Sequence, residues 1–266
     1  MTKFMEEQSK KTLSIELTWS FEPDNLFEAD LEISSVDYRV AISVGRVIAT
    51  TSQLPIDSLK AKQADIEVFV INLFMGAQIV NRASYKLSAP TITHVDKNGI
   101  RNYIIECQTG YFEIRGGMVD LIYTRADGVV VDTKADRIKR RKLLAQQCAH
   151  LARIDYTMAR MLRSHQAALL DPEDELIHLY EIRDAAAARL GGDHAAKRKL
   201  NVPQKLWSRF GELCNELPLK QGRHRGKANG ELRDVTEIEL TEARSFAVIV
   251  MEAYIRYRTD SATGTV

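Results

Sequence analysis

The stretch ADRIKRRKLLAQQCAHLARIDYTMARML, residues 135–162, marks the point where the sequence changes from strand-like to helix-like patterning. Its apolar residues recur at steps of three and four, which predicts the buried stripe of one long helix. The stripe consists of Leu144, Cys148, Leu151, Ile154, Met158 and Met161 or Leu162. The sequence therefore predicts an α+β protein with a sheet-rich domain at residues 1–133 and a helical domain at residues 134–266.

Short runs in the first half show the alternation or the β-branched content that is typical of strands. These runs are residues 13–19, 37–48, 79–87, 91–95, 100–108, 111–114, 118–123 and 129–132. Residues 59–75 predict a helix, although the β-branched residues within 66–73 leave a strand open as the alternative. We expect a mixed or antiparallel sheet with one helix packed on it, and a hairpin at Asn98-Gly99.

Composition limits the classes of protein that fit. The chain has 266 residues, 45% of them hydrophobic and 27% charged, which is ordinary for a globular protein of two domains. Its formal net charge of +1 gives no global attraction to nucleic acid or membrane, so any such attraction must be local. Three widely spaced cysteines, a charged start and the lack of a long apolar run predict a cytoplasmic protein with no membrane partner.

The second half carries helix start and stop signals. Asp171-Pro172-Glu173-Asp174 opens one helix and Gly191-Gly192 ends it. Residues 195–214 predict a helix, a tight turn at Asn201 and a second helix with Pro203 in its first turn. Thr236 and Glu239 form a capping box before the last helix. The pattern predicts an all-α domain of four helices.

The helix-turn-helix spacing within residues 195–214 has two interpretations. Gln204, Lys205 and Ser208 would be exposed on the second helix and could read DNA. Trp207 and Phe210 make the same helix suitable for a buried core, which favours a structural turn.

Residues 218–227, PLKQGRHRGK, form a basic loop between two predicted helices. If this loop acts on RNA, His224 would be the general acid or base, and Arg223 and Arg225 would clamp phosphate. A solvated loop without function is the alternative. Further candidates for nucleic-acid binding are Lys220, Lys227, Arg183 and Arg209. The basic run 134–142 is either a solvated helix face or a second phosphate-facing patch.

The segment from Glu175 to Arg183, the Gly-Gly break, Leu213-Cys-Asn215 and Arg223-His224 together resemble the HEPN domains, over roughly residues 135–258. The resemblance implies a dimeric, metal-independent endoribonuclease that uses the ribose 2′-hydroxyl, in a bacterial stress or defence system. Active members carry an arginine four to six residues before a histidine. No arginine stands there before His224, whereas the pairs Arg160/His165 and Arg189/His194 have this spacing.

Asp120, Asp132 and Lys134 resemble the motif of the PD-(D/E)XK nucleases, over residues 116–147. That resemblance implies a magnesium-dependent DNA nuclease as an alternative function. We predict that these residues do not form a usable metal site, because the helix expected on the sheet offers only Glu67 as an acidic partner beyond its first turn.

A third alternative is a non-catalytic scaffold that dimerises through its helices and binds a protein. The apolar content of the helical half predicts a homodimer with the basic loop near its two-fold axis. The residues expected to exceed the needs of one core are Met158, Met161, Leu162, Leu169 and Leu170.

Overall fold

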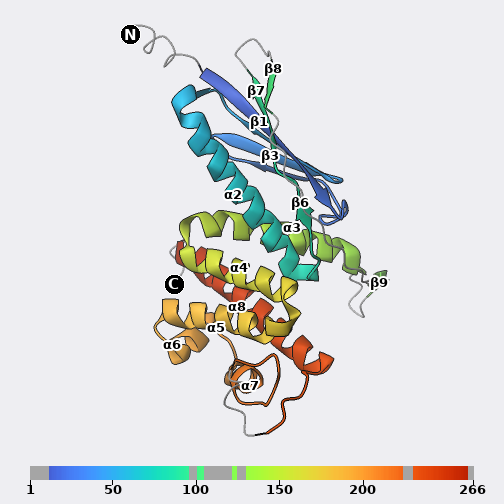
Figure 1. The fold of residues 1–266 in the computed structure, drawn as a ribbon, viewed down its shortest axis with the longest axis vertical. Helices are drawn as coiled ribbons and strands as arrows, with labels where there is room; N and C mark the ends of the chain where they lie inside the picture. Colours follow the sequence, from blue (N-terminus) through green and yellow to red (C-terminus); the bar gives the residue numbers. More distant parts are fainter. Residues whose placement is uncertain (1–11, 96–100, 105–121, 125–129, 224–229, 263–266) are drawn as a thin grey trace. The chain divides into compact units, whose positions relative to one another are not determined.

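Figure 1 shows the computed structural model of the chain, which describes residues 12–95, 101–104, 122–124, 130–223 and 230–262. The chain divides into two compact units, residues 1–146 and 147–266, which we call the sheet unit and the helical unit. The fold is α+β, with an antiparallel sheet before the helices, as predicted. The division between the two units falls within helix α3 (Thr133–Ile154).

The sheet is built around the long strand β1 (Thr12–Glu22). Its order is β2-β3-β4-β1-β7-β8, and neighbouring strands pair antiparallel. The other strands on this path are β2 (Leu31–Ser34), β3 (Tyr38–Ser43), β4 (Arg46–Thr51), β7 (Thr91–Val95) and β8 (Arg101–Ile104). The short strands β5 (Leu54–Pro55) and β6 (Lys86–Leu87) pair with the two ends of β1. A separate pair joins β9 (Ile122–Thr124) to β10 (Val130–Asp132).

Helix α2 (Ile56–Asn81) packs against this sheet, as Figure 1 shows. Alternate β1 side chains from Ile15 to Phe21 are buried, which is the pattern of a strand with one face on a core. Aromatic rings join the two layers: the Phe21 and Phe74 centroids lie 5.1 Å apart in an edge-to-face arrangement. The core of the sheet unit therefore lies between β1 and α2.

Several boundaries in the sheet unit differ from the predictions. Residues 37–48, predicted as one strand, contain all of β3, a turn at Gly45 with φ +67°, and the start of β4. The strand predicted over 79–87 was wrong at its start, because α2 continues to Asn81. Strand β2 was not predicted. The helix predicted at 59–75 is confirmed, and the strand alternative for 66–73 was wrong.

Helix α2 is unusually long and apolar. Among the described helices, its segment Asp57–Val80 is long and apolar enough to cross a bilayer, and 61% of its most apolar window is buried. The expectation that no apolar run reaches this length was therefore wrong. Burial of this kind is also found in the core helix of a soluble protein.

The basic run at the start of α3 is partly internal to the sheet unit. Arg141 is 1% exposed, and its Nη1 lies 2.5 Å from Glu28 Oε1 and donates to the Leu26 carbonyl. Burial lowers the pKa of Arg141, while Glu28 opposes this shift. Arg137 also pairs with Glu28, and Lys142 donates to a backbone carbonyl. These three side chains bond to groups of the sheet unit. They therefore fit neither a solvated helix face nor a phosphate-facing patch.

In the helical unit, α5 (Glu175–Leu190) contacts α4, α6, α7 and α8. The bounds are α4 (Tyr156–Leu170), α6 (Asp193–Leu200), α7 (Gln204–Asn215) and α8 (Glu237–Ala262), with a 3-10 turn at Pro172–Asp174. Within the described ranges the unit thus contains five α-helices and the last residues of α3. The predicted domain of four helices is not confirmed.

The long helix predicted across 144–162 was wrong, because α3 and α4 are separate helices that meet at Asp155. The Asp155 backbone is extended, and Oδ1 accepts from Thr157 N at 2.9 Å and from Met158 N at 3.2 Å. Oδ2 accepts from Tyr254 Oη at 3.0 Å and from Arg258, both on α8. A buried carboxylate therefore caps α4 and ties the helix break to α8.

The start signal at residues 171–174 is only partly confirmed, because these residues form a 3-10 turn without a side-chain cap from Asp171, and α5 begins at Glu175. The stop signals are confirmed. Gly191 ends α5 in the left-handed conformation, and Asn201 does the same for α6. Pro203 occupies the position before α7 rather than its first turn. In the capping box, Glu239 N donates to Thr236 Oγ1 and Thr236 N donates to Glu239 Oε2.

The apolar residues behind the dimer prediction are mostly in the core. Met158, Met161 and Leu162 are fully buried, and only Leu170 of the five is exposed. The surplus apolar surface that motivated the prediction is therefore smaller than expected. Self-association stays a prediction that rests on the family resemblance.

Candidate functional site

The basic loop is described through its two ends. His224, Arg225 and Lys227 lie outside the described residues, as does Asp120. The described chain stops at Arg223 and resumes at Gly230. We call residues 218–223 and 230–235 the loop stems.

The loop stems are hydrogen-bonded to each other and to the end of α7. Lys220 N donates to the Arg233 carbonyl at 3.0 Å, and Arg233 N donates to the Pro218 carbonyl at 3.0 Å. Arg223 N donates to the Cys214 carbonyl of α7 at 2.8 Å. These bonds fix Arg223, the first residue of the basic cluster, against the helical core.

Gly222 is buried at this junction. A Cβ at Gly222 would lie 3.2 Å from the Leu219 carbonyl oxygen and 3.5 Å from the Cys214 carbonyl oxygen. The φ of Gly222 is not in the positive region, so an unusual backbone conformation is not the reason for glycine here. The close approach of two carbonyl groups is the observed reason for glycine here.

The Arg223 side chain lies between an aromatic ring and a carboxylate, both supplied by α5. Its guanidinium carbon is 4.2 Å from the centroid of the Tyr180 ring, within the range of a cation–π contact. Its Nη1 is 3.4 Å from Asp184 Oδ2. Burial raises the pKa of Asp184, and the nearby Arg223 and Arg183 oppose that shift. One third of the Arg223 side chain remains exposed.

The other described cations predicted to bind nucleic acid are each paired with a carboxylate. Arg183 pairs with Asp193, and Lys220 pairs with Asp234 at 2.8 Å. Arg209 lies 2.9 Å from Glu212 and 3.0 Å from Glu242. These pairs reduce the attraction that Arg183, Arg209 and Lys220 exert on a phosphate backbone.

The second loop stem is joined to α8 by Arg233 and Glu239. Arg233 donates to both carboxylate oxygens of Glu239, at 2.9 Å and 2.6 Å. This bond and those from Thr236 lower the pKa of Glu239 to about 2, although burial acts in the opposite direction. The native protein therefore holds this carboxylate ionised to a lower pH than the unfolded chain does.

This pKa predicts an acid-dependent loss of stability. The contribution of Glu239 is fully present above its ordinary pKa of 4.5 and is lost as the pH falls toward about 2. We expect the difference in unfolding free energy between the wild type and Glu239→Gln to shrink between about pH 6 and about pH 2.5. Urea unfolding at several pH values measures this difference, and a difference that stays constant would contradict the assignment.

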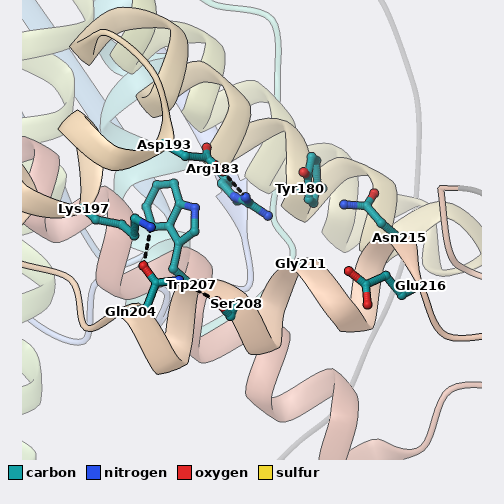
Figure 2. Close-up of a pocket in the computed structure, with 10 residues that line it drawn as sticks. All are labelled: Tyr180, Arg183, Asp193, Lys197, Gln204, Trp207, Ser208, Gly211, Asn215 and Glu216. Carbon is teal, nitrogen blue, oxygen red and sulfur yellow. Dashed lines mark hydrogen bonds and ion pairs between the residues drawn. The ribbon is translucent and has the colours of Figure 1, made fainter.

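Beside the first loop stem, a polar recess of about 260 Å³ opens among α5, α6 and α7 (Figure 2). Tyr180 and Arg183 come from α5, Asp193 from α6, and Trp207 and Gly211 from α7. Asn215 and Glu216, at the end of α7, line the opposite side from Trp207 in Figure 2. The recess therefore borders the residue, Tyr180, that also contacts Arg223.

Arg183 is the central side chain of the recess. It is 9% exposed, and its guanidinium carbon lies 4.9 Å from the Tyr180 centroid and 5.1 Å from the Trp207 centroid. Its Nη2 donates to Asp193. A Cβ at Gly211 would lie 2.8 Å from Nη1, so a glycine within α7 lets the guanidinium occupy this place. Glycine costs a helix about 1 kcal/mol relative to alanine.

Three buried polar atoms at the recess have no hydrogen-bond partner among the described residues. They are Arg183 Nε and Trp207 Nε1, which are donors, and Asn215 Oδ1, which is an acceptor. A buried polar group without a partner costs about 1–3 kcal/mol. Such atoms usually have a water molecule or a ligand as partner, so the recess has the properties of a binding site.

The second helix of the helix-turn-helix spacing belongs to the core. Trp207 and Phe210 are buried, which favours the structural interpretation over a DNA-reading helix. Gln204, Lys205 and Ser208 are exposed as expected. Gln204 accepts from Lys197 and donates to Ser208 at 2.7 Å, so two of these three side chains are engaged with each other.

The described part of the magnesium motif has a structural role. Asp132 Oδ1 accepts from Lys134 N and Ala135 N, both at 3.0 Å, and so caps α3. The Lys134 side chain is exposed. The residues that the structure describes contain no group of three His, Cys, Asp or Glu placed to hold a metal ion. With Asp120 outside the described residues, our prediction of no usable metal site stays a prediction.

The sequence did not point to Tyr180, Trp207, Asn215 or Glu216 as functional residues, because aromatic residues at helical spacing usually signal core. One signal was available. Gly211 stands inside a segment that is otherwise a good helix, one turn after Trp207, and a helical glycine often permits a close approach.

Comparison with known proteins gives no relative for this site: no protein-family model, no curated protein and no solved structure matches the chain.

Proposed function

We propose that the helical unit is a nucleic-acid-associated module that binds single-stranded RNA through the basic loop. The observation that carries the proposal is the fixed position of Arg223, whose backbone is bonded to α7 and whose guanidinium lies on Tyr180. A cation held in place loses less conformational entropy on binding phosphate than a free side chain does.

The charge pattern of the loop supports the same function. Residues 223–229 contain three cations, Arg223, Arg225 and Lys227, and no carboxylate. Arg223 pairs with Asp184 of α5, so the excess within this segment comes from Arg225 and Lys227, whereas Arg209 is paired with two carboxylates. A local excess of positive charge attracts a phosphate backbone even when the whole chain is nearly neutral.

Removing two loop cations is expected to weaken RNA binding. Counterion release predicts about 25-fold lower affinity at about 0.1 M salt for Arg225→Ala combined with Lys227→Ala. Both substitutions leave Arg223 and its contacts in place. The measurement is the fluorescence anisotropy of a labelled single-stranded RNA titrated with the full chain.

The matched control removes two cations outside the loop, Arg198 and Lys205, which are exposed residues of the same unit. Alanine at both positions changes the net charge by the same amount and should leave the affinity nearly unchanged. Equal losses in the two double variants would contradict a loop-specific site. A loss confined to the control would favour the helix-turn-helix alternative.

Cleavage by His224 stays a prediction, as does the HEPN resemblance that implies it. To test for metal-independent cleavage, the titration is run in buffer that contains a magnesium chelator, and the length of the RNA is measured afterwards. Cleavage that Asp132→Ala abolishes and that requires magnesium would instead support the nuclease alternative. A cytoplasmic location and a homodimer belong to the same proposal.

A further inference from the structure

The recess offers donors on one side and acceptors on the other. Figure 2 shows the Arg183 guanidinium pointing into the space between Trp207 and Tyr180, with the Glu216 carboxylate turned toward Gly211 from the far side. Arg183 Nε and Trp207 Nε1 are donors without partners, and Asn215 Oδ1 is an acceptor without a partner. A ligand that satisfies these atoms must present acceptors along one edge and donors along another.

We propose that this recess binds a guanine base, an assignment that rests on the proposed function of the helical unit in binding RNA. Guanine presents O6 and N7 as acceptors along one edge, and N1–H and the 2-amino group as donors along the adjoining edge. Both edges are available in an unpaired base of single-stranded RNA.

The acceptor edge of guanine matches the Arg183 side of the recess. Arginine paired with O6 and N7 is the commonest specific contact to guanine, because the guanidinium fork matches their spacing. Arg183 is 9% exposed and held between two rings, so its guanidinium is already oriented. The indole N–H of Trp207 supplies a second donor next to it.

The donor edge of guanine matches the end of α7. The buried Asn215 Oδ1 and the Glu216 carboxylate can accept from N1–H and from the 2-amino group. Glu216 is exposed, and among the described residues its carboxylate has no side-chain hydrogen bond or ion pair. The two acceptors belong to adjacent residues, Asn215 and Glu216, about one helical turn after Gly211.

The mixed charge of the recess argues against a free phosphate or carboxylate as the ligand. Arg183 and Lys197 line it, and so do Asp193 and Glu216, so cations and carboxylates balance. An oxyanion placed against Arg183 would face carboxylates as well as cations. A neutral base that both accepts and donates hydrogen bonds satisfies both sets. Arg223, on the same Tyr180 ring, is placed to contact the phosphate of the same nucleotide.

Adenine lacks the required pattern. Its 6-amino group would direct a donor at the Arg183 side, and its N1 would direct an acceptor at Glu216. A good bidentate contact to a base discriminates by about 1–3 kcal/mol, which corresponds to about 5- to 160-fold in affinity. We therefore expect the full chain to bind guanosine monophosphate at least about fivefold more tightly than adenosine monophosphate. Inosine monophosphate, which lacks the 2-amino group, should be intermediate.

Isothermal titration calorimetry of the full chain with these three nucleotides and with inorganic phosphate tests the assignment. The phosphate is common to all the nucleotides, so differences among them report on the base. Glu216→Ala removes an acceptor at an exposed position and should abolish most of the guanine preference without affecting adenosine monophosphate. The matched control is Glu231→Ala, an exposed carboxylate of the second loop stem, which should leave the preference intact.

Equal affinity for the guanine and adenine nucleotides, or inorganic phosphate binding as tightly as guanosine monophosphate, would overturn the assignment. Arg183→Met gives a second test, since it should remove the guanine preference, and circular dichroism checks that the variant folds. RNA binding that depends on the loop cations but shows no preference for guanine would contradict the guanine assignment and leave the proposed RNA binding intact. Binding of guanosine monophosphate without RNA binding would contradict the proposed RNA binding and leave the guanine assignment intact.

Discussion

Replacing Asp155 by alanine is expected to lower the unfolding free energy of the helical unit by about 3–5 kcal/mol. The carboxylate is 4% exposed, caps α4 through two backbone N–H groups, and accepts from Tyr254 and Arg258. Alanine leaves a buried hydroxyl, a guanidinium and two backbone donors without their acceptor. Urea unfolding measures the loss.

The two tryptophans of the chain allow this loss to be assigned to one unit. Trp19 lies in β1 of the sheet unit, and Trp207 lies in α7 of the helical unit. In a Trp19→Phe background, indole fluorescence reports on the helical unit alone. The control is Thr236→Ala, which removes the hydroxyl that caps α8 in the same unit and should cost only about 1 kcal/mol. Equal costs for the two variants would contradict the role of Asp155 as a buried link.

Replacing Arg244 by methionine is expected to cost about 3–5 kcal/mol as well. Glu175, the first residue of α5, is 3% exposed, and Arg244 donates to both of its carboxylate oxygens, at 2.8 Å and 2.9 Å. The hydrogen bond to Glu175 raises the pKa of Arg244. Methionine would leave a buried carboxylate without its cation, which is costlier than losing the pair altogether.

The comparison with two other variants makes this prediction specific. Arg209→Met removes an arginine of α7 whose partners Glu212 and Glu242 are exposed, and should cost at most about 1 kcal/mol. The double variant Glu175→Leu with Arg244→Met should recover most of the lost stability, because it removes both buried charges. A loss for Arg244→Met no larger than that for Arg209→Met would contradict this account.

The sequence predicted the order of sheet and helices because local periodicity carries that information. The prediction of one long helix was wrong at Asp155, because the spacing of apolar residues stays helical across the break between α3 and α4. The aspartate caps α4 with Oδ1, and its Oδ2 is held by Tyr254 and Arg258 of α8, about 100 residues away in the chain. A contact between such distant residues leaves no trace in the local pattern.

Strand boundaries failed for a related reason. Val44 and Gly45 sit within an apolar, β-branched run, so the run looked like one strand, yet Gly45 turns the chain with φ +67°. Residues Ile79 and Val80 are β-branched and favoured a strand, but both belong to α2, and Ile79 extends its buried face. Packing of α2 against the sheet therefore outweighed the preference of these β-branched residues for a strand.

The candidate site was predicted in part. The basic loop was visible as a run of cations between glycines, because charge and glycine are read directly from the sequence. The recess could not be predicted from the sequence, because Tyr180 and Trp207 come from different helices and look like core residues. Their role depends on Arg183 lying between them, which is a property of the packing of α5 against α7.

The salt dependence of RNA binding shows whether the loop cations contact phosphate. The slope of log affinity against log salt concentration counts the cations that neutralise phosphate, at about 0.7 per cation for a single strand. We expect the slope to become shallower by about 1.4 in Arg225→Ala with Lys227→Ala, and to stay the same in Arg198→Ala with Lys205→Ala. Affinity that does not depend on salt, or the same slope in the wild type and the loop variant, would show that the loop does not bind RNA through these cations.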